Sequence, residues 1–403
     1  MDSVEAQSHT PQELKELEQQ YLFQNYARYP VVLQRGKGVY VYDTDGKRYL
    51  DLISGIGVNA LGYAHPRITK VIQKQAGLLL HTSNLYYHEF QGPLAKRLAE
   101  ASGLQRSFFC NSGAEAMETA LKMARAHGRK ISPGKFEFVA LENSFHGRTF
   151  GALSITGQPK YRAPFEPLLG GVTFVPRNDI AALEAAVTEN TAAIIVEIIQ
   201  GEGGILPVSL EMLQKARELA TKHDAILIFD EIQCGVGRTG TYFAYQLFDT
   251  PIMPDAAVIA KPISCGLPLG VLMANDKSAS AIGPGMHGST YGGGPLACHV
   301  ALEFFDVLDE LLPSINSVGS FFRMRLTELA QKHKFIKDVR GAGLMIGVEL
   351  SIPGKQMVLD GIEEGVLFNC THETVLRFLP PYILTEQDVD RAVGSLDKIF
   401  DKY

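Results

Sequence analysis

Apolar residues recur along this chain with two different periods, which alternate through its middle part. Short apolar runs predict strands at 107–110, 136–141, 172–175, 192–198, 225–230 and 257–260. Helical patterns separate several of these runs, notably at 114–128 and 209–223. Strands that alternate with helices favour a largely parallel sheet with crossover helices. We therefore predict an α/β fold for this part of the chain.

The two ends of the chain have other patterns. Residues 1–20 predict a solvated, partly helical arm, and in 39–52 the pair Asp45-Gly46 separates two alternating segments, which is typical of a hairpin. After about residue 305 a helix, three apolar runs and a closing helix predict a smaller α+β domain. A chain of 403 residues exceeds one compact core. We expect a segment 1–60 that packs with the small domain, a large α/β domain 61–305 and the small domain 306–403.

Composition excludes several classes of protein. The net charge of −6 argues against a nucleic-acid or anionic membrane surface, because both require a basic excess. No stretch is apolar enough to span a bilayer, and the first twenty residues lack a signal or transit pattern, so we expect a cytoplasmic protein. The five cysteines are scattered without metal-ligand spacing. Reduced thiols and no metal site are the expectation.

Two of the predicted strands end beside ionisable residues. Lys261 follows the run DAAVIA and opens the loop PISCGLPLG, and Asp230 ends the run AILIFD. Both side chains should lie at the carboxyl edge of the sheet, where open α/β sheets bind ligands. A lysine there can form a Schiff base, and an aspartate can pair with a pyridinium nitrogen. The pair indicates a pyridoxal-phosphate enzyme, although Asp230 alone is equally well explained as a helix N-cap.

The segment NSGAEAMETALKMAR, from residue 111, predicts a helix directly after a strand. Ser112 and Glu115 have the spacing of a capping box, and four apolar residues share one face: Met117, Ala120, Leu121 and Ala124. The free N–H groups of a first turn containing Gly113 and Ala114 would bind a phosphate. Taken alone, the segment is better explained as a well-capped structural helix.

Two further loops carry polar groups suited to a cofactor and an acidic substrate. In FHGRT, Phe145 can cover a flat ring and Arg148 can bind a carboxylate, although a lone arginine is more often part of a structural ion pair. In HGSTYGGGPLAC, Ser289 and Thr290 offer hydroxyls to phosphate oxygens, and the alternative is a plain glycine-rich connector.

The segment DEIQCGVGRTG contains a dinucleotide-type pattern, with glycines at 235, 237 and 240. These glycines begin five residues after the strand, and no clear βαβ unit follows, so we interpret the match as coincidence. The informative residues are Asp230 and Gln233, which offers a hydrogen-bond partner for a ring hydroxyl.

Taken in order, these motifs resemble the class III (ornithine-type) pyridoxal-phosphate-dependent aminotransferases. They are NSGAEA, FHGRT, QGEGG, FDEIQCGVGRTG, Lys261 with GLPLG, and GSTYGGGPLAC, and the resemblance extends over 42–382. Within the family the chain is most similar to the acetylornithine type. The resemblance implies fold type I, with a mostly parallel sheet in the large domain and a small domain built from both chain ends.

The resemblance also implies roles for individual residues. Lys261 would carry pyridoxal 5'-phosphate as a Schiff base and move the proton, while Asp230 would bind the pyridine N–H. The remaining cofactor contacts would come from Gly113, Ala114, Phe145, Gln233 and, across a homodimer interface, Thr290. The substrate contacts would come from Arg148, Ser289, Glu202 and Arg377.

Glu202 and Arg377 resemble a substrate switch. Arg377 would hold the α-carboxylate of glutamate, and Glu202 would pair with Arg377 when the other amino donor is bound. The implied reaction moves the terminal amine of N-acetylornithine to 2-oxoglutarate, as in arginine biosynthesis. Ornithine, succinylornithine, 4-aminobutyrate, or an acetyl-lysine- or aminoadipate-type donor remain alternatives, as does a noncatalytic cofactor-binding regulator. Pro262 and Cys265, inside the loop after the lysine, depart from the family pattern and bear on substrate preference.

Overall fold

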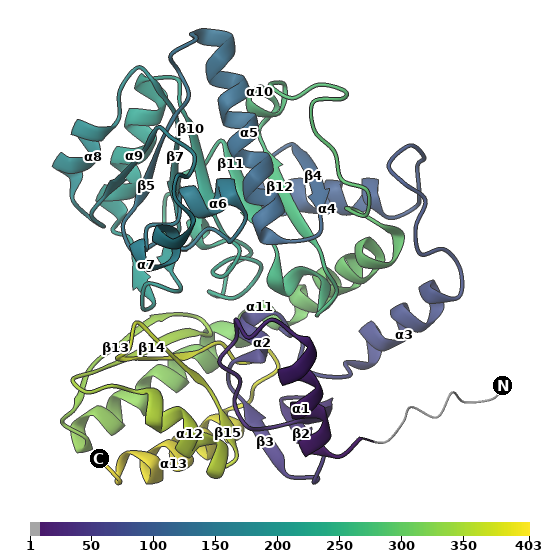
Figure 1. Cartoon of the computed structure of the whole chain (residues 1–403), viewed down its shortest axis with the longest axis vertical. Helices are drawn as coiled ribbons and strands as arrows, with labels where there is room; N and C mark the ends of the chain where they lie inside the picture. Colours follow the sequence, from purple (N-terminus) through teal and green to yellow (C-terminus); the bar gives the residue numbers. More distant parts are fainter. Residues whose placement is uncertain (1–8) are drawn as a thin grey trace.

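The computed structural model describes residues 9–403, and its largest element is a seven-stranded sheet of order β4-β12-β11-β10-β7-β5-β6 (Figure 1). The strands are β4 (Arg106–Cys110), β5 (Glu137–Leu141), β6 (Val172–Val175), β7 (Thr191–Val196), β10 (Ile226–Asp230), β11 (Ala256–Ile259) and β12 (Gly270–Ala274). All six predicted strands are confirmed. The sheet is parallel except for β12, which runs antiparallel to both of its neighbours. The sequence analysis missed β12, because its short apolar run follows a Gly- and Pro-rich loop.

The two faces of this sheet are covered by helices from the predicted positions. Alternate strand residues face opposite sides, so Ile226 and Ile228 of β10 belong to one apolar core and Leu227 and Phe229 to the other. Helix α5 (Gly113–Ile131) covers the first side, and α9 (Leu210–Lys222) covers the second. The predicted buried face of α5 is confirmed, because its four apolar residues are all buried.

Two smaller sheets lie below the large one in Figure 1. The first joins β1 (Leu33–Lys37), β2 (Tyr40–Asp43), β3 (Arg48–Asp51) and β15 (Val366–Leu367). The second joins β13 (Ile336–Ala342), β14 (Met345–Leu350), β17 (Val375–Phe378) and β16 (Asn369–Thr371). The predicted hairpin is confirmed as the antiparallel pair β2–β3. The parallel pairing of β15 with β3 ties the two chain ends together, and it supports our proposal that 1–60 packs with 306–403.

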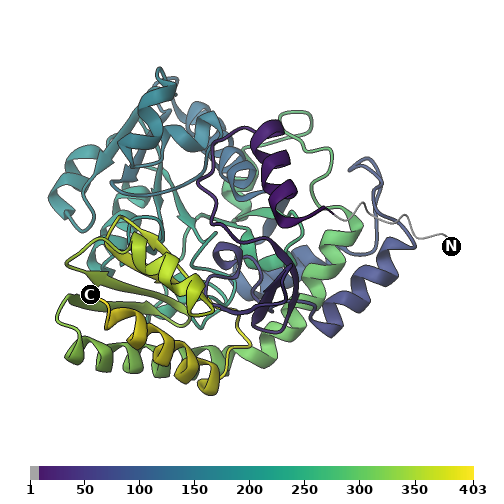
Figure 2. The same cartoon turned by 60° about the horizontal axis from the view of Figure 1, so that its bottom comes forward.

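A single long helix, α11 (Pro295–Lys332), connects the two regions and passes through the boundary proposed near residue 305. The closing helix α13 (Glu386–Phe400) packs along α11, as the turned view shows (Figure 2). The arm predicted for 1–20 contains the exposed helix α1 (Pro11–Tyr21), and residues 1–8 lie outside the described part. In the described part of the chain, no helix is long and apolar enough to cross a membrane.

The remaining elements are short connections around these layers. The helices are α2 (Ser54–Gly57), α3 (Pro66–Ala76), α4 (Gln91–Ser102), α6 (Phe150–Ser154), α7 (Pro159–Arg162), α8 (Ile180–Ala186), α10 (Asp276–Ala279) and α12 (Lys355–Glu363). The strands β8 (Ile199–Gln200) and β9 (Leu206–Pro207) form a two-stranded ribbon. Three 3-10 turns complete the list: Ala163–Phe165, Ala244–Leu247 and Lys261–Ser264.

Candidate active site

The carboxyl ends of β4, β5, β7, β10 and β11 surround a cavity of about 400 Å³. Open α/β sheets bind their ligands at this edge. Eight of the predicted site residues line the cavity: Gly113, Ala114, Phe145, Arg148, Glu202, Asp230, Gln233 and Lys261. The sequence prediction that Lys261 and Asp230 share one sheet edge agrees with this arrangement.

Asp230 ends β10 and is held by a buried histidine. Nδ1 of His146 lies 2.7 Å from Oδ2 of Asp230, and both side chains are buried. The other carboxylate oxygen accepts a hydrogen bond from the backbone N–H of Ile232 at 3.1 Å. Burial alone would lower the pKa of His146, but the hydrogen bond and charge of Asp230, with the charge of Glu197, raise the pKa above its ordinary value. The sequence analysis gave His146 no role, and only its place in FHGRT signals it.

Glu197 is a second acidic group at the cavity, and it too was given no role by the sequence analysis. Its carboxylate accepts hydrogen bonds from the backbone N–H groups of Phe145 at 3.0 Å and Gly201 at 3.3 Å. Burial and the neighbouring charge of Asp230 raise the pKa of Glu197 to about 7, against the opposing effect of His146. A carboxyl group with this pKa takes up or releases a proton near neutral pH.

Lys261 begins a short 3-10 turn after β11 and has a left-handed backbone, with φ of 49°. A non-glycine residue in this conformation is strained, and such residues are common at functional sites. Burial and the neighbouring charge of Arg377 lower the pKa of Lys261 to about 8, against the opposing effect of Glu202 and Asp230. A lysine with this pKa has a substantial neutral, nucleophilic fraction near neutral pH. Cys265, four residues on, also has positive φ, where glycine would be unstrained.

The first turn of α5 faces the cavity with free backbone donors. Among the described residues, the N–H groups of Gly113 and Ala114 have no protein acceptor. A Cβ at Gly113 would lie 2.6 Å from Ile232 Cδ1, so a larger residue there would require the Ile232 side chain to move. A capping box requires two reciprocal hydrogen bonds, and only one of them is present. The Glu115 carboxylate accepts from the backbone N–H of Asn111 at 2.7 Å and not from that of Ser112, so this part of the prediction is wrong. Ser112 Oγ does accept from Glu115 N at 3.2 Å.

Arg148 reaches the cavity from the loop after β5 and is exposed. Its guanidinium carbon lies 3.9 Å from the ring centroid of Tyr161 and 5.4 Å from that of Phe145. Within residues 9–403, Arg148 forms no ion pair with a carboxylate, contrary to the structural alternative considered for it. An aromatic support and an unpaired guanidinium suit the binding of an acidic group.

Glu202 and Arg377 form an ion pair at the side of the cavity nearest the small domain. Arg377 is buried in β17, and it also donates to Gln233 Oε1 at 3.2 Å and to Asn369 Oδ1 at 3.1 Å. Burial alone would raise the pKa of Glu202, but the charge and hydrogen bonds of Arg377 lower it below the ordinary value. Glu202 therefore remains a carboxylate partner for Arg377 at neutral pH.

Ser289 and Thr290 lie outside this cavity in the single chain. Ser289 Oγ accepts from Asn111 Nδ2 at 3.2 Å, which places it beside the start of α5. Thr290 is exposed and lines a separate small hollow with His81, Ser83 and His88. The glycines at 235, 237 and 240 lie in turns that lead into the short 3-10 turn Ala244–Leu247, with no α-helix between them and β11, which agrees with their interpretation as a coincidental match.

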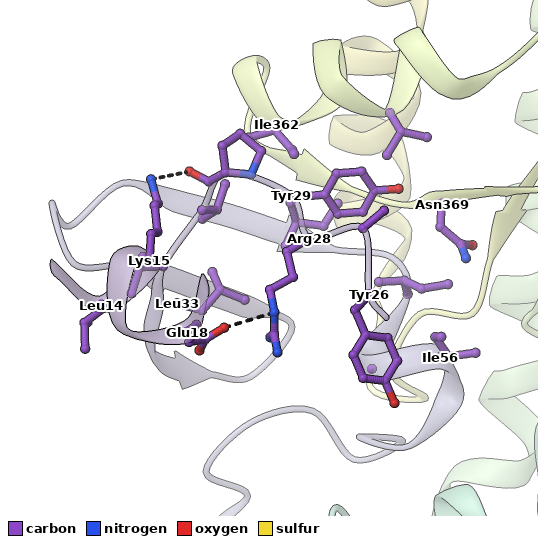
Figure 3. Close-up of a pocket in the computed structure, with 18 of the residues that line it drawn as sticks. Leu14, Lys15, Glu18, Tyr26, Arg28, Tyr29, Leu33, Ile56, Ile362 and Asn369 are labelled. Atoms are coloured by element: carbon purple, nitrogen blue, oxygen red, sulfur yellow. Dashed lines mark hydrogen bonds and ion pairs between the residues drawn. The ribbon is translucent and has the colours of Figure 1, made fainter. Parts of the chain in front are cut away.

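A larger cavity, of about 760 Å³, lies between the N-terminal arm and the small domain (Figure 3). Its wall contains an exposed ion pair between Arg28 and Glu18 at 2.9 Å, and Lys15 donates to the Pro30 carbonyl at 3.2 Å. None of the predicted site residues lines it. The smaller cavity is therefore the candidate active site, because it contains the lysine, the carboxylates and the free helix N–H groups.

The residues around the smaller cavity fit pyridoxal phosphate. The unpartnered N–H groups of Gly113 and Ala114 suit its phosphate, and the buried Asp230 carboxylate suits its ring nitrogen. Phe145 offers an aromatic face on the cavity wall, and Lys261 offers the amine for the covalent link. The required chemical groups are thus present in one cavity.

Comparisons with known proteins agree with this arrangement. The family model "Aminotransferase class-III" matches residues 21–400. The acetylornithine aminotransferase of Methanocaldococcus jannaschii is 47% identical over 96% of this chain and 97% of its own length. The acetylornithine aminotransferase of Aquifex aeolicus is 46% identical over 94% of this chain and 99% of its own length. Among solved structures, ornithine aminotransferase from Toxoplasma gondii has a TM-score of 0.93 at 35% identity. The match covers 98% of this chain and 96% of the Toxoplasma chain. Acetylornithine aminotransferase from Elizabethkingia anophelis has a TM-score of 0.88 at 33% identity. The match covers 98% of this chain and 100% of the Elizabethkingia chain.

Proposed function

The chain belongs to the class III aminotransferase family, and from this premise we infer that its amino donor is N2-acetyl-L-ornithine. The reaction moves the terminal amine of the donor to 2-oxoglutarate, giving N-acetyl-L-glutamate 5-semialdehyde and L-glutamate, a step of arginine biosynthesis. The substrate assignment rests on the series of acetylornithine aminotransferases that are 42–47% identical to this chain over nearly its whole length. An intact set of Lys261, Asp230 and Arg377 argues against a noncatalytic regulator.

The bound cofactor supplies an electron sink that stabilises negative charge on the substrate carbon. Asp230 would pair with the ring N–H, and His146 would keep the carboxylate oriented toward it through the 2.7 Å contact. Gly113 and Ala114 would bind the phosphate through their backbone N–H groups, Phe145 would cover the ring, and Gln233 would contact the ring hydroxyl. With its pKa lowered to about 8, the Lys261 amine can accept a proton from the substrate carbon and return it.

Two arginines bind the carboxylates of the substrates. In the first half-reaction, Arg148 binds the carboxylate of N-acetylornithine, with Ser289 nearby, and Glu202 keeps Arg377 neutralised. In the second, Glu202 releases Arg377, which binds the α-carboxylate of glutamate or 2-oxoglutarate. The ion pair between Glu202 and Arg377 supports the first of these two states.

The proposed functional unit is a cytoplasmic homodimer with active sites at the subunit interface. Thr290 is exposed and lies outside the cavity of its own chain, as expected for a residue that reaches the neighbouring cofactor's phosphate. Exposed apolar side chains surround this region, among them Leu80, Leu85, Tyr87 and Tyr291. Such a cluster on a water-soluble surface is typical of an interface.

The substrate is tested by adding single donors to the protein reconstituted with pyridoxal phosphate and following the visible absorbance of the cofactor. N-acetylornithine, ornithine, succinylornithine and 4-aminobutyrate are compared at equal concentration. Rapid loss of the visible band with N-acetylornithine, and slow loss with ornithine, is the expected result. A faster reaction with any other donor would overturn the substrate while leaving the family unchanged.

A further inference from the structure

The glycine-rich loop after Asp230 contains a fully buried arginine that the proposed chemistry does not use. Arg238 is 0% exposed, and two of its nitrogens, Nε and Nη2, have no hydrogen-bond partner among the residues that the structure describes. Within residues 9–403 it forms no ion pair. Burial lowers the pKa of Arg238, the direction expected for a cation without a counter-ion. A charge in such a place costs stability, and nothing in the proposed chemistry accounts for it.

The hydrogen bonds of the Arg238 side chain lead into the small domain. Its Nη1 donates to the Pro380 carbonyl at 2.5 Å and to the Leu344 carbonyl at 3.1 Å. Its guanidinium carbon lies 4.5 Å from the ring centroid of Tyr382. In return, Leu344 N donates to the Arg238 carbonyl at 3.0 Å, and the Tyr382 hydroxyl donates to the Val236 carbonyl at 2.9 Å. The loop therefore both donates hydrogen bonds to the small domain and accepts hydrogen bonds from it.

The same two chain segments also meet at the substrate-binding arginine. Arg377 lies three residues before Pro380, and its Nη1 donates to Gln233, which lies five residues before Arg238. The segment 233–238 thus joins 377–382 at three points: Gln233 with Arg377, Val236 with Tyr382, and Arg238 with Pro380. Because Asp230 directly precedes this loop, the three contacts relate the position of Arg377 to that of the cofactor-binding carboxylate.

We propose that Arg238 is a positioning residue that sets the place of Arg377 and thereby the binding of α-carboxylate substrates. The proposal rests on the proposed function of Arg377. Loss of the Arg238 contacts lets the end of β17 shift, and a displacement of about 1 Å at a binding group can cost as much as 100-fold. The glutamate half-reaction depends on Arg377, whereas the N-acetylornithine half-reaction uses Arg148 and leaves Arg377 paired with Glu202. The two half-reactions therefore respond differently.

The test compares the wild type with Arg238→Gln, Arg238→Lys and a control, Asn316→Ala. The control removes a hydrogen bond of 2.8 Å from Asn316 to the Gly240 carbonyl, which holds the same loop to α11 without involving 377–382. Each half-reaction is measured separately by cofactor absorbance. Binding of glutarate, an unreactive dicarboxylate, is measured by calorimetry, and thermal unfolding gives the stability of each variant.

Arg238→Gln is expected to weaken glutarate binding and raise KM for glutamate by about tenfold or more, while the N-acetylornithine half-reaction changes less than about threefold. Arg238→Lys should recover part of the loss, because an ammonium can still donate to one carbonyl. Equal losses in both half-reactions, unchanged glutarate binding, or the same selective loss in Asn316→Ala would overturn the proposal.

A variant with a smaller change keeps the test decisive if Arg238→Gln does not fold. Tyr382→Phe removes only the hydroxyl that donates to Val236 and leaves the ring beside Arg238. Tyr382→Phe should also weaken glutarate and glutamate binding more than it affects the N-acetylornithine half-reaction, by a smaller factor than Arg238→Gln. Equal effects on both half-reactions would overturn the proposal. If N-acetylornithine is not the donor, the wild type itself fails to react with it. A failure of the Arg238 proposal appears only in the variants, with whichever donor the wild type accepts.

Discussion

His146 Nδ1 lies 2.7 Å from Asp230 Oδ2, and both groups are buried side chains in the cavity wall. The pKa of His146 is raised, so the imidazole holds its second proton to a higher pH than an ordinary histidine does. Asp230 therefore has a buried hydrogen-bonding neighbour whose protonated form its own charge favours. In the proposed function, this relationship would keep the carboxylate oriented toward the ring nitrogen.

Replacement of His146 tests this relationship. His146→Phe should lower kcat by about 10- to 100-fold, because a hydrogen bond to a charged group contributes about 1.5–3 kcal/mol. His146→Gln retains a donor and should recover part of the activity. Stopped-flow absorbance of each half-reaction, at saturating cofactor, gives the rates. Wild-type rates in His146→Phe would contradict the role.

Removal of Glu202 tests the substrate switch. Glu202→Ala leaves Arg377 without its carboxylate partner, so the preference should shift toward α-amino donors by about tenfold, equivalent to about 1.4 kcal/mol. The ratio of kcat/KM for glutamate to that for N-acetylornithine measures the shift. An unchanged ratio would show that Arg377 needs no partner when the first substrate is bound.

The lowered pKa of Lys261 predicts how the apoprotein takes up pyridoxal phosphate. Because the neutral amine is the nucleophile, the rate of reconstitution should rise with pH up to about 8 and stay level above it. N-α-acetyl-lysine, an ordinary amine, serves as the control, and its rate should continue to rise toward pH 10. Visible absorbance follows both reactions. A rate for the apoprotein that keeps rising to pH 10 would argue against a depressed pKa.

Glu231 predicts a pH-dependent stability. Burial raises its pKa from 4.5 to about 7, against hydrogen bonds from Ala244 N and Tyr245 N that lower it. The folded protein therefore keeps a proton that the unfolded chain releases, and stability falls as pH rises from about 4.5 to 7, by as much as about 3 kcal/mol. Glu231→Gln should flatten this part of the unfolding curve measured by denaturant titration. The exposed Glu100→Gln serves as the control, and an unchanged slope in Glu231→Gln would refute the assignment.

The strands and the cofactor-binding edge could be predicted because they depend on local patterns. Buried parallel strands are continuous apolar runs, and a residue that follows such a run lies at a known edge of the sheet. This is why Asp230 and Lys261 could be placed at one edge from the pattern, whereas Phe145 and Gly113 were added by the resemblance to the family. Strand β12 could not be separated from its Gly- and Pro-rich loop, since five apolar residues carry no distinct period.

The residues behind the cavity depend on contacts that no spacing encodes. His146 meets Asp230 across 84 positions of sequence, and Arg238 meets Pro380 across 142. The second half of the capping box failed for a local reason, because the Glu115 carboxylate reaches Asn111, whose N–H and side chain both donate to it. Ser289 and Thr290 lie outside the cavity of the single chain, which is consistent with the proposed contribution of Thr290 to a neighbouring subunit.

The most direct measurement follows the nitrogen atom itself. N2-acetyl-L-ornithine labelled with nitrogen-15 at its terminal amine is incubated with 2-oxoglutarate and the reconstituted protein, and the glutamate formed is examined by mass spectrometry. The account predicts glutamate labelled in the same amount as the semialdehyde released, and no labelled glutamate with Lys261→Ala. Unlabelled glutamate, or none in the wild type, would contradict the proposed transfer.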